Sequence, residues 1–291
     1  MRKLACLLLV GLLATVAAAC GSKKESAADS TAETSCAKAD LTLVTPGQLT
    51  VATDNPAFPP WFGGTPRKPW QVSDPRSGQG YESAVAYAVA KELGFSKDEV
   101  NWIHVPFNTS FAPGTKTFDF DINQISFSPA RAKVVAFSDS YYDVNQSVVV
   151  NKGTPIASAT SIAALKRYEL GAQLGTTSYQ FIQDTVKPSK QPSVFPQNAG
   201  AVQALKNKQI DGLVLDLPTA FYVTAVQVPN SKVLGQFEAK PGGEHFGMVF
   251  QKGSTLVTCV NAALSKLRSD GTLDKLQQQW LAKATGAPTL K

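Results

Sequence analysis

Two charged side chains stand where a protein could bind a charged small molecule. Arg131 follows Pro129, and proline suits the first turn of a helix, so the guanidinium comes just after an expected strand-to-helix turn. A guanidinium there can hold a carboxylate through two parallel hydrogen bonds. Asp216 ends the apolar run 212–215, where burying an unpaired carboxylate would be costly. On these residues alone, a solvent-exposed arginine and an aspartate that caps the next segment remain open alternatives.

A polar segment, residues 175–178, separates an expected strand near Leu170 from a helix expected to begin around Tyr179. Its backbone N–H groups and the Thr177 hydroxyl, with Thr176 beside it, can bind a carboxylate. An ordinary helix N-cap is the alternative.

The sequence offers little for metal or nucleophilic chemistry. It has two histidines, His104 and His245, and four cysteines, with no Cys-x-x-Cys or His-Glu-x-x-His spacing. We therefore expect no metal, and no catalytic residue, because no nucleophile lies beside a base. No cofactor is expected either.

Length and composition fit one large globular domain or two small ones. The 291 residues are 43% hydrophobic and 17% charged, which excludes global disorder. Basic residues exceed acidic ones by six, and two of them, Arg2 and Lys3, lie in a segment that we expect to be removed. The remaining excess is too small to indicate nucleic-acid binding.

Alternating strand and helix patterns must position these side chains. The β-rich run 49–53 ends at the turn formers Asp54-Asn55-Pro56, so a loop follows. Within residues 82–93 apolar side chains recur every four residues, which predicts an amphipathic helix. Further strands are expected at 120–125, 147–150, 170–174 and 212–215, with a helix led by Asn198 before the last. This order predicts an α/β fold.

The N-terminus predicts export. A positive start precedes the apolar run 4–16, which is too short to span a membrane as a helix and is typical of a signal peptide, here residues 1–19. A retained short anchor is the alternative. Small residues before Cys20 resemble a bacterial lipobox, although Ala17 stands where leucine is more usual; this resemblance implies cleavage before Cys20 and acylation of its thiol. Residues 20–37 would then be the lipidated cysteine and a flexible tether.

The other cysteines suggest a crosslink. Once Cys6 is removed and Cys20 is acylated, Cys36 and Cys259 remain. In an oxidising compartment we expect them to form a disulfide, with two buried free thiols as the alternative.

The order of several short motifs resembles family 3 solute-binding proteins, the polar amino acid receptors of ABC importers. The motifs span nearly all of residues 45–282, and they are Leu49-Thr-Val-Ala-Thr-Asp54, Gly80-Tyr81-Glu82, Ser126-Phe-Ser-Pro-Ala-Arg131, Phe137-Ser138-Asp139-Ser140-Tyr141-Tyr142, Gly175-Thr176-Thr177 and Asp211-Gly-Leu-Val-Leu-Asp216. The resemblance implies a type II periplasmic-binding-protein fold, in which two α/β lobes joined by two crossing strands close over a ligand. We place the crossings near 143–146 and 243–247, with residues 38–143 and 246–291 in lobe 1 and 144–245 in lobe 2.

The resemblance also implies roles for site residues. A buried amino acid needs a fixed cation for its carboxylate and a fixed anion for its ammonium. Arg131 would supply the first and Asp216 the second. Further ligand contacts are implied or expected for Thr176, Thr177, Gln124, Ser126, Phe58, Trp61 and Asp54.

The identity of the ligand stays open, because Ala84 and the long loop 62–79 depart from the family pattern. No second Arg or Lys is evident among the expected pocket residues, so polar neutral or basic amino acids rank first. A basic side chain could pair with Asp54 and stack on Phe58 or Trp61. The cations of the long loop, Arg67, Lys68 and Arg76, could reverse this preference.

Two alternatives use the same fold. One is an enzyme, such as a dehydratase, and the other is a sensor or adhesin module. For a receptor, the expected partners are a free amino acid, an ABC permease and the outer face of the bacterial membrane through the lipid anchor, with no nucleic acid. A monomer is expected.

Overall fold

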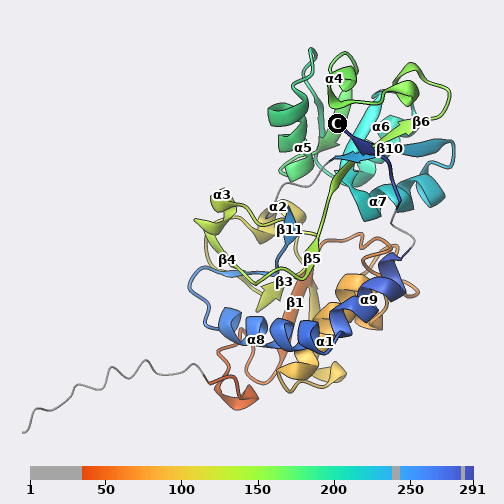
Figure 1. Cartoon of the computed structure of the whole chain (residues 1–291). Helices are drawn as coiled ribbons and strands as arrows, with labels where there is room; N and C mark the ends of the chain where they lie inside the picture. Colours follow the sequence, from red (N-terminus) through yellow and green to blue (C-terminus); the bar gives the residue numbers. More distant parts are fainter. Residues whose placement is uncertain (1–34, 238–242, 283–285) are drawn as a thin grey trace, which may run out of the picture. The chain divides into compact units, whose positions relative to one another are not determined.

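The computed structural model describes residues 35–237, 243–282 and 286–291, which build two mixed β-sheets surrounded by helices (Figure 1). This agrees with the predicted α/β class. The expected signal peptide, Cys20 and residues 21–34 of the tether lie outside the described residues. Nowhere in the described part is there a helix long and apolar enough to span a bilayer.

The first sheet has the strand order β2-β1-β3-β12-β4, with β1 parallel to β2 and β3 and with β12 antiparallel to its neighbours. Its strands are β1 Leu49–Thr53, β2 Val100–His104, β3 Phe120–Asp121, β4 Val135–Phe137 and β12 Val249–Gln251. The helices of this part are α1 Tyr81–Glu92, α2 Phe107–Ser110, α3 Pro129–Ala132, α8 Leu256–Ser269 and α9 Thr272–Leu281, with 3-10 turns at Lys38–Asp40, Pro75–Ser77 and Lys97–Glu99.

The core of this part joins β1 to three helices. All five residues of β1 are buried, and Val51 shares one apolar cluster with Val85 of α1 and Leu264 of α8. Helices α1, α8 and α9 lie side by side (Figure 1). Gly80 leads into α1 with φ 91°, and a Cβ there would lie 2.5 Å from the Cα of Phe62, so only glycine fits this turn.

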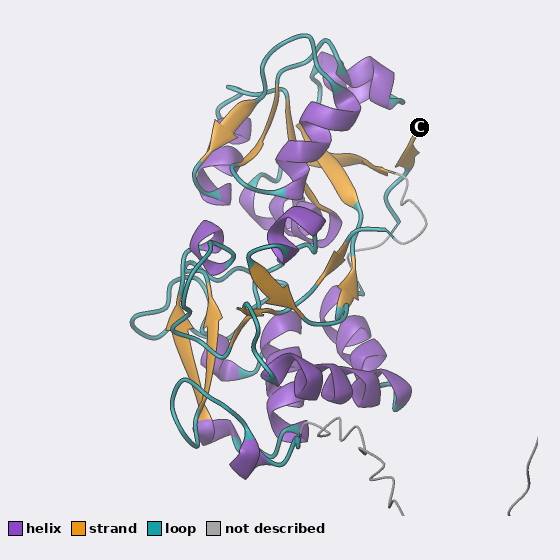
Figure 2. Ribbon diagram, turned by 90° about the vertical axis from the view of Figure 1, so that its left-hand side faces the viewer, coloured by secondary structure: helices purple, strands orange, loops and turns teal. Residues whose placement is uncertain are grey.

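The second sheet has the strand order β13-β10-β6-β9-β7-β8, and Figure 2 shows its strands in orange among purple helices. Its strands are β6 Gln146–Asn151, β7 Leu170–Gln173, β8 Ser193–Phe195, β9 Gly212–Asp216, β10 Ser231–Phe237 and β13 Thr289–Leu290. Its helices are α4 Ile162–Leu165, α5 Thr177–Phe181, α6 Asn198–Lys206 and α7 Leu217–Tyr222; a 3-10 turn covers Pro155–Ser158, and α5 and α7 continue as π-helical turns over Ile182–Val186 and Val223–Gln227.

A two-stranded ribbon lies between the sheets in chain order. Strand β5, Tyr142–Asp143, pairs antiparallel with β11, His245–Phe246. The chain runs from β4 through β5 to β6, and later returns to the first sheet through β11 and β12. The sequence predicts its two crossings in these same segments, whereas the hinge motion and the lobe boundaries remain predictions.

Three differences between the sequence expectations and the structure have an identifiable physical cause. Strand β3 ends at Asp121 rather than continuing to 125, because the chain turns at Gln124, whose φ is 47°. Helix α5 begins at Thr177 rather than around Tyr179, because Thr176 caps it. The last strand, β13, pairs with β10 of the second sheet and not with lobe 1, since the edge of β10 offers unpaired backbone groups.

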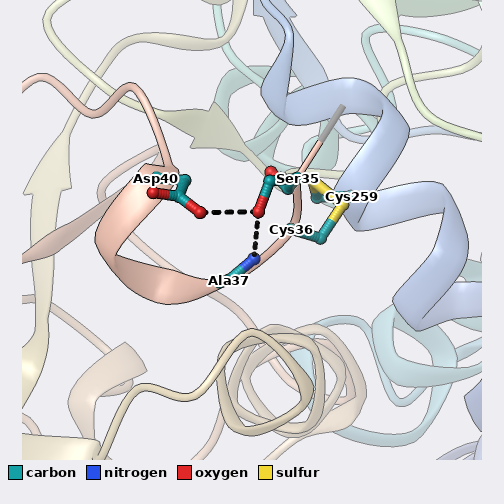
Figure 3. Close-up of a disulfide and its surroundings, with 5 residues drawn as sticks. All are labelled: Ser35, Cys36, Ala37, Asp40 and Cys259. Atoms are coloured by element: carbon teal, nitrogen blue, oxygen red, sulfur yellow. Dashed lines mark hydrogen bonds between the residues drawn. A yellow bond between two sulfur atoms is a disulfide. The ribbon is translucent and has the colours of Figure 1, made fainter. Parts of the chain in front are cut away.

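The predicted disulfide is present. Cys36 and Cys259 are joined by an S–S bond, which ties the segment before β1 to α8 (Figure 3). Ser35 beside it donates a hydrogen bond to Asp40 at 2.6 Å. The crosslink fastens the start of the described chain to the helical layer of the first sheet.

Replacing both cysteines with serine is expected to lower the free energy of unfolding by about 2–4 kcal/mol. The bond closes a loop with a sequence separation of 223 residues, and its loss frees the unfolded chain. Urea unfolding of the double variant, with the wild-type protein as the control, measures the change. A double variant as stable as the control would contradict the expectation.

Candidate functional site

A cavity of about 110 Å³ is lined by residues from both sheets' connecting segments. The chain before β4 contributes the loop after β1, the turn after β3 and α3. The chain after β6 contributes the end of β7, the start of α5, the end of β9 and α7. All nine residues predicted to bind a ligand line this cavity: Asp54, Phe58, Trp61, Gln124, Ser126, Arg131, Thr176, Thr177 and Asp216.

Arg131 is held at the cavity by backbone and aromatic contacts. Its Nη1 donates to the carbonyl oxygen of Ser126 at 2.6 Å, and its Nη2 donates to that of Gly175 at 2.7 Å. The guanidinium carbon lies 4.2 Å from the centre of the Phe111 ring. Burial lowers the pKa of Arg131 to about 10, which leaves it charged at neutral pH. None of the ion pairs between described residues includes Arg131, so its charge is available to an anion.

Two hydroxyl groups belong to the segments whose backbone Arg131 contacts. The Oγ of Ser126 is 3.3 Å from the Oγ1 of Thr177, which brings together the segment before α3 and the first turn of α5. Thr176 is used differently from the expectation, because its hydroxyl accepts the backbone N–H of Tyr179 at 3.1 Å and donates to the Gln173 carbonyl oxygen. Thr177 is therefore the threonine whose hydroxyl is directed at the cavity's polar groups.

Asp216 ends β9 and shares an amide partner with a second carboxylate. The Nε2 of Gln146 donates to Oδ1 of Asp216 at 2.7 Å and to Oε2 of Glu244 at 3.0 Å. Ser178 fixes the amide by donating to its oxygen at 2.6 Å. Burial, and then the charge of Glu244, raises the pKa of Asp216 well above its usual value. A cation bound beside these two carboxylates would therefore offset the repulsion between their charges.

A buried glutamate holds the turn at Gln124. Glu82, in the first turn of α1, accepts the backbone N–H of Gln124 at 2.6 Å and also binds its side-chain amide and the Tyr141 hydroxyl. Burial raises the pKa of Glu82 to about 7, although these hydrogen bonds act in the opposite direction. The side-chain amide of Gln124 is thus engaged by the protein, which stabilises its left-handed backbone.

The two aromatic residues predicted at the site, Trp61 and Phe58, differ in their exposure. Trp61 is 1% exposed, packs edge-on against Tyr142 and Phe246, and donates its indole N–H to Thr219 at 2.9 Å. This contact links the loop after β1 to α7. Phe58 is only partly buried and lines the cavity, so it is the better placed of the two for ligand contact.

Asp54 faces His104, whose Nε2 lies 3.3 Å from the Oδ1 of Asp54.

The cations of the long loop 62–79 do not line the cavity. Arg76 instead pairs with Asp74 at 2.7 Å and donates to the carbonyl oxygen of Arg67. Among the lining residues that the structure describes, Arg131 is the one permanent cation, against the carboxylates of Asp54 and Asp216. Within the described ranges there is also no group of three metal-ligating side chains.

The sequence patterns did not identify three residues of the site, which are Glu82, Gln146 and Glu244. Glu82 ends the Gly80-Tyr81-Glu82 motif, Gln146 lies within the expected first crossing, and Glu244 lies within the second. Those positions were the available signals. Their side-chain directions depend on how α1, β6 and the ribbon are packed, which no local pattern states.

Residues 62–283 match the model of the bacterial extracellular solute-binding proteins, family 3. The chain belongs to this family. The two-sheet architecture and the cavity between connecting segments agree with that membership. The family consists of binding proteins, and the relatives described next are likewise named as binding proteins.

This family 3 protein is similar to two curated proteins of Bacillus subtilis (strain 168). It is 30% identical to the ABC transporter glutamine-binding protein, over 97% of this chain and 98% of the relative. It is 26% identical to the arginine-binding extracellular protein, over 73% of this chain and 82% of the relative.

Solved structures of ancestral arginine-binding proteins are also similar to this chain. An ancestral arginine-binding protein bound to glutamine matches with a TM-score of 0.67 and 30% identity, covering 81% of this chain and 98% of that one. An ancestral arginine-binding protein bound to arginine matches with a TM-score of 0.66 and 31% identity, covering 80% and 98%.

Proposed function

We propose that this protein captures a polar amino acid outside the cytoplasm and delivers it to an ABC importer. The observation that carries the proposal is that a buried cation, Arg131, and the Asp216 carboxylate line the same cavity. A zwitterionic amino acid presents the complementary pair of charges, and each needs a partner when it is buried. The names of the B. subtilis relatives support the same class of ligand.

The carboxylate of the amino acid would lie against Arg131 and the two hydroxyls. Arg131 brings a charge, and Ser126 and Thr177 bring short polar side chains from the two parts of the chain. The ammonium would lie against Asp216, whose charge Gln146 helps to hold through one hydrogen bond. A ligand would thus join the residues around β3 to those around β7 and β9, which favours closure about the β5–β11 ribbon.

We further propose tethering through an acylated Cys20, as the small residues before that cysteine suggest. The tether would keep the binding domain near a permease in the same membrane.

The charges at the cavity favour a neutral polar or basic ligand. Asp54 and Asp216 outnumber Arg131, and Glu244 adds a further carboxylate beside Asp216. The second carboxylate of glutamate or aspartate would find no second lining cation among the described residues. A basic side chain could instead approach Asp54 and the face of Phe58.

A thermal-shift panel of the twenty amino acids with the full chain tests the proposal. We expect arginine, lysine or glutamine to raise the melting temperature most, because ligand binding stabilises the folded state by mass action. Glutamate and aspartate should raise it least. A panel without any shift would contradict amino acid capture, and a shift for glutamate or aspartate alone would contradict the charge argument.

A further inference from the structure

Glu244 contacts the two hydroxyls to which the carboxylate of a ligand has been assigned. Its Oε1 accepts hydrogen bonds from Ser126 Oγ and from Thr177 Oγ1. Its Oε2 accepts from the Gln146 amide at 3.0 Å. The side chain comes from the segment just before β11 and reaches residues of both parts of the chain.

The surroundings of Glu244 are those of a bound carboxylate. Arg131 donates to the backbone oxygen of Ser126 and to that of Gly175, two residues before Thr177, so the cation lies beside both hydroxyl-bearing segments. A glutamate side chain and the α-carboxylate of an amino acid carry the same chemical group. They would need the same donors and the same cation, and two ionised carboxylates placed together repel each other.

We propose that Glu244 is a built-in competitor for the ligand's α-carboxylate and so determines how strongly this protein selects ligands that carry one. The inference rests on the proposed amino acid binding. The carboxylate of an incoming amino acid takes the Ser126 and Thr177 hydroxyls from Glu244. The Gln146 amide still offers Glu244 a donor, 3.0 Å from its Oε2. A ligand without a carboxylate leaves Glu244 where it is.

Comparing L-arginine with L-argininamide separates this role from other effects of Glu244. Both probes carry the ammonium and the guanidinium, but only arginine has the α-carboxylate. The ratio of the two dissociation constants therefore reports on the one group that differs between the probes, a carboxylate in arginine and an amide in argininamide. Calorimetry on the full chain would give this ratio for the wild type, for Glu244→Gln and for the control Glu92→Gln. Glu92 belongs to α1, pairs with Lys266 and does not line the cavity.

We expect Glu244→Gln to raise the preference for arginine over argininamide by about tenfold, because like-charge repulsion against the carboxylate is removed. The Glu92→Gln variant should leave the preference unchanged. An unchanged or reduced preference in Glu244→Gln would overturn the competitor role. If neither probe binds the wild type, L-glutamine and its α-amide replace them; failure of every amino acid would count against the proposed function itself.

Discussion

Replacing Arg131 with alanine is expected to weaken amino acid binding by about 3–5 kcal/mol, because the ligand's buried carboxylate loses its charged partner. This corresponds to roughly a hundredfold to several thousandfold increase in the dissociation constant. The guanidinium is well placed for that effect, since backbone oxygens of Ser126 and Gly175 fix it and the Phe111 ring covers it. Calorimetry with the best amino acid from the thermal-shift panel measures the change.

A fold defect must be separated from a loss of ligand contact, because Arg131 also joins the turn before α3 to the segment before α5. Urea unfolding of Arg131→Ala without ligand would reveal such a defect. Arg131→Lys keeps the charge but loses the planar fork, so we expect only partial recovery of affinity. The control is Arg167→Ala, an exposed arginine that packs on Tyr168. Unchanged affinity in a folded Arg131→Ala variant would contradict the role of Arg131 in binding the carboxylate of the ligand.

Replacing Asp216 with asparagine is expected to weaken ligand binding at least about a hundredfold while stabilising the protein alone by about 1–2 kcal/mol. The ligand's ammonium loses its anion, which lowers affinity. The ligand-free fold gains, because the asparagine carries no charge to bury and no charge to oppose Glu244. Asp216 thus illustrates a residue that serves binding at a cost in stability.

The gain in stability has a defined pH dependence. The pKa of Asp216 is raised in the folded protein, so the folded state favours the protonated carboxyl. That contribution to stability is fully present below the usual pKa of about 4 and is lost as the pH rises through the higher folded value. The advantage of Asp216→Asn should therefore be largest near neutral pH and disappear below about pH 4.

Urea unfolding from pH 4 to 8, with the exposed Asp184→Asn as the control, measures this dependence. If Asp216→Asn is less stable than the wild type at neutral pH, the carboxylate is stabilising the fold and our reading of its burial is incorrect.

Much of the fold could be predicted because local patterns determine its elements. Strand β1 has the predicted bounds, α1 is displaced by one residue, and α6 begins at Asn198 as expected. Apolar periodicity and turn-forming residues are local patterns, and the elements that they favour keep the same type in the folded protein. The predicted end of β3 was wrong because a run of apolar residues does not indicate the turn at Gln124. Glu82, in a helix distant in the sequence, stabilises that turn.

The candidate site was predictable only in part. The nine predicted residues line one cavity because the motif order, compared with a known family, carries tertiary information that composition lacks. Glu82, Gln146 and Glu244 were not predicted. Each acts through a hydrogen bond to a residue at least 31 positions away, such as Gln146 to Thr177.

The sequence by itself determined the α/β class, the family, the Cys36–Cys259 crosslink and nine of the residues around the cavity. Only the tertiary structure decided which polar groups already have partners. The hydroxyl of Thr176 caps α5, and the side-chain amide of Gln124 binds Glu82. The hydroxyls of Ser126 and Thr177 both donate to Glu244. The reason is physical: a residue's type determines which hydrogen bonds it can make, whereas the packing of distant elements determines which of them it does make.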